Sequence, residues 1–77
     1  MIFQFHQESN MLYIKLSDGE SVESEEVATG IVLDFDADSQ VIGIEIEDAE
    51  GRMDLTRFEL RALPVSAQVS ETTNATL

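Results

Sequence analysis

Residues 31–47 read IVLDFDADSQVIGIEIE, and this stretch decides the fold. Apolar side chains recur at every second position on both sides of the acidic segment 36–40, whose Asp and Ser residues favour turns. Such alternation is typical of a strand that buries one face, because successive side chains of a strand point to opposite sides. We therefore expect two antiparallel strands joined by a short acidic turn.

The same alternation continues towards the N-terminus. It is visible in residues 2–6 and 11–16, and a polar turn follows each run. Residues 21–27 are polar at most positions, as expected for an edge strand. The sequence thus predicts a mainly β fold, an antiparallel meander of about five to six short strands with at most one short helical segment after residue 48. It leaves the order of the strands open.

Residues 53–63 fit two patterns. Leu55, Phe58 and Ala62 recur as on one face of a helix, whereas Phe58, Leu60 and Ala62 alternate as in a strand. A helix of this length needs tertiary packing to persist. We expect a short helical turn followed by a sixth strand, with a longer helix as the alternative.

The chain is expected to form one domain. Pro64 cannot donate a hydrogen bond to a strand ladder and therefore ends the β region. The residues beyond it are rich in Ser, Thr, Ala and Val and contain no aromatic side chain. We expect a single β domain over residues 1–63 and a flexible C-terminal tail over residues 64–77.

One side of the predicted sheet collects the apolar side chains. The predicted core comprises Phe3, Phe5, Leu12, Ile14, Leu16, Ile31, Leu33, Phe35, Ile42, Ile44, Ile46, Leu55 and Leu60. A single sheet has two faces, so something must cover this one: the segment after residue 48, a curl of the sheet, or a second subunit. We therefore expect a homo-oligomer, most simply a dimer, or a bound partner chain.

The composition limits the classes of partner that the chain can be expected to bind. The chain has 77 residues, a net charge of −12 and no cysteine. A domain this short buries only about 60% of the surface that it exposes when unfolded, and it usually needs a disulfide, a metal or a partner. Negative charge disfavours nucleic acids and anionic membranes, which bind through Lys and Arg clusters. A basic protein partner or a divalent cation suits the charge better.

The sequence contains no recognisable catalytic apparatus. Nucleophilic catalysis needs a base beside the nucleophile, and the only histidine, His6, lies in the first predicted strand. We interpret His6 as structural or exposed, and we expect a non-enzymatic protein without a cofactor. The N-terminus lacks the pattern of a signal peptide, and no run approaches the ~20 apolar residues of a membrane span. We therefore expect a cytoplasmic protein.

The acidic turn is a candidate cation site. Its predicted ligands are Asp34, Asp36, Asp38 and Glu45, where Glu45 is the twelfth position counted from Asp34. This spacing coincides with the calcium loop of an EF-hand. However, the position that needs glycine is Ser39, and the flanks alternate as strands rather than helices. A calcium or magnesium site at the hairpin tip is therefore one hypothesis, and a turn that simply favours Asp and Ser is the other.

A second acidic cluster lies in residues 20–26. Glu23 and Glu25 share one face of an extended strand, where like charges do not stabilise the fold. They either keep an edge strand from pairing with other chains or present a surface to a basic partner. The candidate partner contacts are Glu23, Glu25, Asp36 and Glu45. The basic residues Arg52, Arg57 and Arg61 cluster later and can balance this charge within one chain or between subunits.

Three ordered stretches carry a family resemblance. They are LYIKLS (residues 12–17), SEEVATGIVLDFD (residues 24–36) and VIGIEIEDA (residues 41–49). Together they resemble the prokaryotic family catalogued as domain of unknown function 2283, over about residues 1–63. The first turn, residues 6–10, and Ser39 in the acidic hairpin, where the family usually has glycine, depart from the pattern.

The resemblance implies a small, mainly β protein with no catalytic residues to carry over. Some members of the family lie beside small toxin-like proteins, and an antitoxin-like role is implied for such members. This implication agrees with the charge of the chain, because an acidic protein can neutralise a basic partner through electrostatic steering and occlusion.

Overall fold

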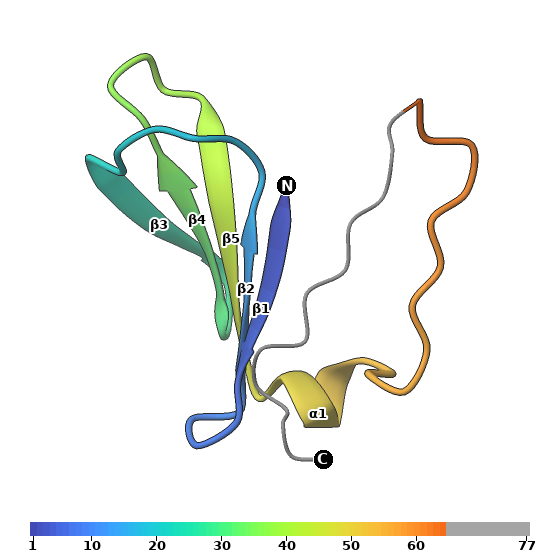
Figure 1. Ribbon diagram of the computed structural model, residues 1–77. Coiled ribbons are helices and arrows are strands. Elements are labelled where there is room, and N and C mark those ends of the chain that lie inside the picture. The colour runs from blue at the N-terminus through green and yellow to red at the C-terminus, as the bar shows by residue number, and fades with distance from the viewer. Residues whose placement is uncertain (65–77) are drawn as a thin grey trace.

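The computed structural model describes residues 1–64, which form one open antiparallel sheet of five strands followed by a short helix (Figure 1). The elements are β1 (Ile2–His6), β2 (Met11–Lys15), β3 (Glu23–Ala28), β4 (Ile31–Phe35), β5 (Val41–Glu47) and α1 (Ala49–Arg52). The predicted mainly β, antiparallel class is confirmed. The expected flexible tail lies outside the described residues apart from Pro64. Within residues 1–64, no helix has the length and apolar composition needed to cross a membrane.

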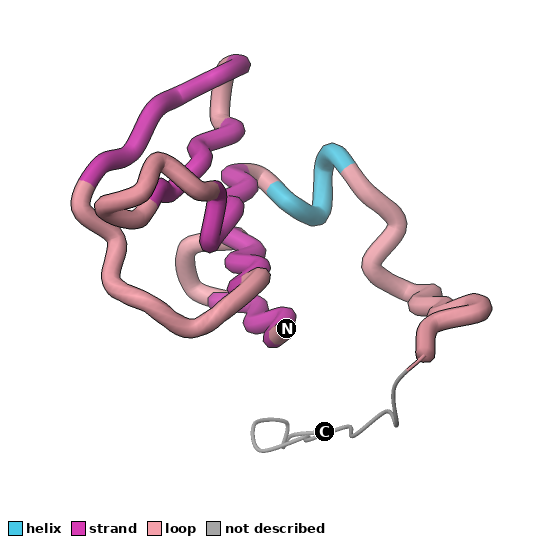
Figure 2. The backbone as a smooth tube through the Cα atoms, turned by 90° about the horizontal axis from the view of Figure 1, so that it is seen from above, coloured by secondary structure: helices cyan, strands magenta, loops and turns pink. Residues whose placement is uncertain are grey.

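The strands lie in the order β1-β2-β5-β4-β3. A β1–β2 hairpin thus lies beside a β3–β4–β5 meander, and β2 pairs with β5 where the two units meet. Residues 16–22 carry the chain from β2 to the far edge at β3 (Figure 1). Viewed from above, α1 and the residues after it lie to one side of the strands (Figure 2). This order makes β1 and β3 the two edges of the sheet.

The strand register separates an apolar face from a polar face. On the apolar face, one row of opposed residues is Phe3, Ile14, Ile44 and Leu33, and the next is Phe5, Leu12, Ile46 and Ile31. On the polar face, the rows are Gln4, Tyr13, Glu45 and Val32, and Ile2, Lys15, Gly43 and Asp34. The alternation in the sequence therefore places the apolar side chains on one side, as predicted.

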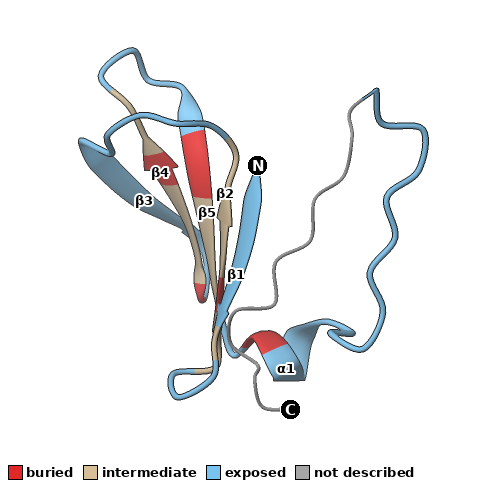
Figure 3. Cartoon of the chain, viewed as in Figure 1, coloured by how far each residue is buried: buried red, intermediate tan, exposed pale blue. Residues whose placement is uncertain are grey.

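Few of these apolar side chains are removed from solvent. The buried ones within residues 1–64 are Leu12, Ile42 and Ala49, and no large side chain there is fully buried. The central strands are mostly half-buried, whereas β1 and β3 are largely exposed (Figure 3). The expected core members that prove exposed are Phe3, Phe5, Leu55 and Leu60. Their exposure follows from the position of β1 at an edge and from a segment after α1 that is exposed throughout.

Residues 53–64 form neither helix nor strand, so the expected sixth strand is wrong. The Asp54 carboxylate accepts hydrogen bonds from the backbone N–H of Thr56 at 2.9 Å and from its hydroxyl at 2.5 Å, which fixes a local turn. Ala62 has a φ of 58°, a left-handed conformation that interrupts an extended run. The alternation of side chains in this segment is therefore not accompanied by strand geometry.

Candidate functional site

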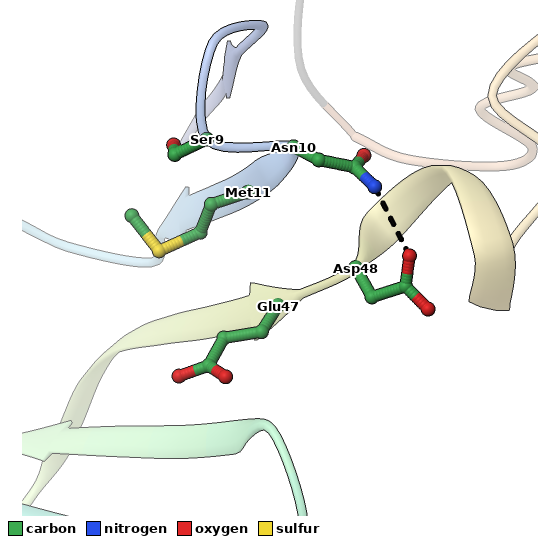
Figure 4. A pocket seen from close by; sticks show the side chains of 5 residues that line it. All are labelled: Ser9, Asn10, Met11, Glu47 and Asp48. Atoms are coloured by element: carbon green, nitrogen blue, oxygen red, sulfur yellow. Dashed lines mark hydrogen bonds between the residues drawn. The ribbon is translucent and has the colours of Figure 1, made fainter.

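Asn10 joins the first turn to the end of β5. Its backbone carbonyl accepts a hydrogen bond from the Ala49 N–H at 2.9 Å. Its side chain donates to Asp48 Oδ1 at 3.0 Å (Figure 4). The same side chain accepts from the Glu50 N–H at 3.0 Å. Asn10 thus caps α1 from a distant turn, since Asp48 makes no side-chain cap of its own. The hollow at this junction is lined by Ser9, Asn10, Met11, Glu47 and Asp48.

Arg52 fastens α1 to the turn between β3 and β4. Its guanidinium donates to the Thr29 carbonyl at 2.6 Å and to the Glu47 carbonyl at 2.7 Å. The guanidinium lies over Gly30, where an added Cβ would come within 3.1 Å of Cζ. Gly30 also has a φ of 79°, which glycine adopts without strain. Arg52 therefore acts within the fold and is not available to a partner.

A carboxylate is buried on the polar face. Asp34 on β4 is only 4% exposed, and Ser24 on β3 donates its hydroxyl to Asp34 Oδ1 at 2.5 Å. Tyr13 on β2 lies over Gly43 of β5, where an added Cβ would come within 2.9 Å of the ring carbon Cζ. Gly43 lies opposite Asp34 and has no side chain, so the Tyr13 ring can pass over β5 towards Asp34. Side chains from β2, β3 and β4 therefore meet on this face.

The electrostatics of this polar cluster favour the neutral forms of Tyr13 and Glu45. Burial raises the pKa of Tyr13, and the charges of Asp34 and Glu45 and a hydrogen bond with Asp34 raise it further. Burial also raises the pKa of Glu45, as do a hydrogen bond with Asp34 and the charges of Asp34 and Glu47. Glu45 thus retains a proton to higher pH than a free glutamate. The cluster joins side chains of β2, β3, β4 and β5.

The residues predicted to bind a cation do not form one site. The predicted ligands are Asp34, Asp36, Asp38 and Glu45. Asp36 accepts the backbone N–H groups of Asp38 and Gln40, both at 2.9 Å, and so stabilises the acidic turn. Asp34 and Glu45 instead belong to the polar cluster. Within residues 1–64, no three acidic or histidine side chains lie close enough together to hold a metal ion. The cation hypothesis rests on sequence spacing alone.

The predicted partner contacts fall on different parts of the sheet. Glu23 lies opposite Phe35 and Glu25 opposite Leu33, so both acidic side chains project to the apolar side of β3. Glu45 lies on the polar face, and Asp36 follows β4 in the acidic turn. Glu23 and Glu25 therefore lie on one face of β3, whereas Asp36 and Glu45 lie elsewhere. The interpretation of this region as an edge strand is confirmed, because β3 is an edge and is exposed throughout.

The other residues singled out in the sequence lie apart from the polar cluster. His6 ends β1, half-buried and opposite Met11. Arg57 and Arg61 are exposed, and both form ion pairs with Glu59, at 2.5 Å for Arg61. Within the described residues, the predicted basic cluster is thus divided: two arginines pair locally, and the third holds α1.

Several exposed apolar side chains, including three phenylalanines, lie on β1 and after α1. On β1, Ile2, Phe3 and Phe5 are 55%, 45% and 37% exposed. Phe58 is 62% exposed and packs edge-on against Phe3, with the ring centroids 5.1 Å apart. Further exposed apolar side chains after α1 are Met53, Leu55, Leu60 and Leu63. We refer to β1 together with residues 53–63 as the apolar flank.

The fold and these surfaces define a small, mainly β domain that has an acidic edge at β3 and an apolar flank at β1. The chain belongs to the family described as protein of unknown function (DUF2283), whose model matches residues 3–50. This confirms the resemblance seen in the sequence, and the match covers the sheet from Phe3 through β5 and ends within α1. Comparisons with curated proteins and with solved structures give no match.

Sequence reasoning missed the contacts that fasten the sheet. A glycine inside an alternating strand often marks the close approach of another group, and this signal applied to Gly43 and the Tyr13 ring. An asparagine at the end of a turn tolerates the left-handed conformation, and Asn10 has a φ of 54°. Nothing local to Arg52 indicated that it would bind carbonyls of two other segments.

Proposed function

We propose that this protein is a self-associating protein-interaction module and that its binding surface is the apolar flank. The observation that carries this proposal is the exposure of Ile2, Phe3 and Phe5 on β1, combined with a sheet in which no large side chain of residues 1–64 is fully buried. Exposed apolar surfaces of this kind mark binding sites. A small domain with a sparse core also gains stability when a partner covers such a surface. The cytoplasm is the expected compartment.

The distribution of charge supports association through β1. Each copy carries a net charge of −12, so two copies repel one another over most of their surfaces. Residues 2–6 include no acidic side chain, whereas β3 carries Glu23, Glu25 and Glu26. Approach through β1 therefore brings together the edge strands that have no acidic side chain and that expose Phe3 and Phe5.

Binding of a basic protein is a second candidate function, and it is favoured by the adjacent, exposed Glu23 and Glu25 at the β3 edge. It corresponds to the antitoxin-like role that the family resemblance implies. Such binding would weaken with added salt and with Glu23→Gln and Glu25→Gln, because it would depend on exposed charges. Binding that is insensitive to both changes would exclude this edge. The cation-binding hairpin, which calcium calorimetry would detect, has less support because the Asp36 carboxylate is engaged with the backbone of its own turn.

Sedimentation velocity over a range of protein concentrations tests the main proposal. We expect a reversible dimer, and we expect Phe5→Ser to weaken it by about 10- to 100-fold, as for loss of a buried aromatic anchor. Val27→Ser is the matched control, because Val27 is 50% exposed on the opposite edge. Ile2→Ser, at the exposed start of β1, provides a second variant with little risk to folding. A wild-type chain that stays monomeric at every concentration would refute the proposal.

A further inference from the structure

The two edges of the sheet differ in their readiness to pair with another strand. β1 hydrogen-bonds to β2 on one side, and no strand of residues 1–64 pairs with its other side. An unpaired edge presents free N–H and C=O groups, and natural sheets usually protect such edges with charged side chains or proline. β1 has neither, since residues 2–6 read IFQFH. β3 has three glutamates in the same situation.

The sequence of β1 is nearly symmetric about Gln4. Phe3 and Phe5 lie on either side of it, and both belong to the apolar face. In an antiparallel pair of β1 strands centred on Gln4, Gln4 lies opposite Gln4 of the second copy. Phe3 of each copy then lies opposite Phe5 of the other. Twofold interfaces require this self-complementarity, because the same surface patch must serve both subunits. Aromatic pairs directly opposite each other are also among the favourable cross-strand contacts.

We infer that the partner of the apolar flank is a second copy of this chain, whose β1 pairs antiparallel with β1 about a twofold axis at Gln4. This inference rests on the proposed function and specifies its partner and geometry. The two five-stranded sheets join into one continuous sheet, and the pairing opposes Ile2 to His6 at each end. No acidic side chain meets another in this register, although each copy has a net charge of −12.

Residues 53–63 of the same chain are the competing occupant. Phe58 already contacts Phe3, but Phe58 remains 62% exposed and its segment forms no strand. It therefore leaves the backbone groups on the outer side of β1 without strand partners. A second copy satisfies these groups and also covers Phe3 and Phe5, which a single aromatic contact does not achieve.

Cysteine cross-linking tests this geometry directly, because the chain contains no cysteine of its own. Directly opposed residues of an antiparallel pair have Cα atoms about 4.5–5.5 Å apart, within the range that a disulfide spans. Gln4→Cys is therefore expected to form an intermolecular disulfide under mild oxidation, with loss of the free thiol. Glu25→Cys, in the middle of the exposed β3 edge, is the matched control and is expected to retain its thiol. Circular dichroism establishes that both variants are folded.

Each outcome bears on a different claim. If the wild type dimerises but Gln4→Cys does not cross-link, or if Glu25→Cys cross-links equally well, the β1 pairing is overturned and self-association stands. A monomeric wild type overturns both the pairing and the proposed function. If Gln4→Cys cross-links only when combined with Phe58→Ser, residues 53–63 cover β1 in the native chain, and the inference fails.

Discussion

β1 and β3 occupy equivalent positions at opposite edges of one sheet, yet their surfaces are opposite in character. β3 is exposed throughout and carries three glutamates, so any strand that pairs with it must approach a row of like charges. β1 exposes Ile2, Phe3 and Phe5 and carries no acidic side chain. Because charged edges discourage pairing, the difference supports the proposal that β3 is the protected edge and β1 the associating one.

The two edges are also fastened differently. Side-chain hydrogen bonds secure the β3 side: Ser24 donates to Asp34 at 2.5 Å, and Glu26 accepts the Gly30 N–H at 2.9 Å. In contrast, β1 is held by its pairing with β2 and by the contact of Phe3 with Phe58. The β3 side is thus stabilised by more side-chain hydrogen bonds than the β1 side, which agrees with the proposed role of β1.

The largest expected effect on dimer affinity comes from placing an acidic side chain on β1, as β3 already has. Gln4→Glu places two carboxylates opposite each other at the proposed axis, and such like-charge contacts cost several kcal/mol. We expect the dimer to be about 100-fold weaker at pH 7, equivalent to ~2.7 kcal/mol. Association should return below the ordinary glutamate pKa of about 4.3, where the carboxylates are neutral. Sedimentation velocity at both pH values measures this.

Gln4→Thr is the control for that variant, because it changes the side chain without adding charge. It is expected to dimerise like the wild type. Equal dimer affinity for Gln4→Glu and Gln4→Thr at neutral pH would place the interface away from Gln4.

Gly43→Ala tests the link between the two sides of the sheet. The added methyl group would overlap the Tyr13 ring, which crosses from β2 towards Asp34 on β4. We expect a loss of about 1–3 kcal/mol in the free energy of unfolding, as for overpacking at a close contact. Urea unfolding at a fixed protein concentration measures it. In a Tyr13→Ala background the cost should largely disappear, and an unchanged cost there would show that the overlap is not its cause.

Removing charge from β3 should make that edge associate as well. With Glu23→Thr and Glu25→Thr, we expect assemblies larger than the dimer, because a chain with two pairing edges grows without closing. Each cross-strand pair contributes only about 0.2–1 kcal/mol, so these assemblies should appear only at high concentration in light scattering. Glu8→Thr and Glu20→Thr remove the same charge from exposed turns and should not assemble further. Equivalent behaviour of both double variants would mean that net charge, not the edge, controls assembly.

The smallest expected effect concerns Glu45. Its folded pKa is raised, first by burial and then by Asp34, so its protonated form stabilises the fold. That contribution is present below the ordinary glutamate pKa and is lost as the pH rises through the raised value. Glu45→Gln should therefore be more stable than the wild type at pH 7.5 by about 0.2–1 kcal/mol, with little difference near pH 4. Thermal unfolding at both pH values measures this.

Glu8→Gln, in the exposed first turn, removes one charge without disturbing the polar cluster and serves as the control. If it stabilises the chain as much as Glu45→Gln does, the gain comes from lowering the net charge and not from the burial of Glu45 and its contact with Asp34.

The alternation in the sequence was sufficient to predict the strands and the two faces of the sheet, because side-chain direction in a strand depends only on position. It did not determine the strand order, which is set by pairing between distant segments such as β2 and β5. The prediction of a sixth strand is wrong for a local reason, because the Asp54–Thr56 turn and the left-handed Ala62 interrupt residues 53–63.

Apart from the sixth, the predicted strands are confirmed, whereas the candidate sites stay predictions. The spacing from Asp34 predicts a cation site at the hairpin tip, and Asp34 and Glu45 do meet on the polar face. The Asp36 carboxylate, however, accepts backbone N–H groups of its own turn, and Asp34 also accepts the Ser24 hydroxyl. Sequence spacing does not reveal such alternative hydrogen-bond partners. The sequence does not reveal the exposure of β1 either, because Phe3 and Phe5 have the same alternating pattern as buried residues. Only the strand order identifies them as edge residues.

Amide hydrogen exchange, followed residue by residue at low and high protein concentration, tests the difference between the edges most directly. Association through β1 predicts that exchange of the β1 amides slows as concentration rises, while exchange of the β3 amides does not change. Slowing at β3, or β1 amides that exchange at the same rate at every concentration, would contradict the account.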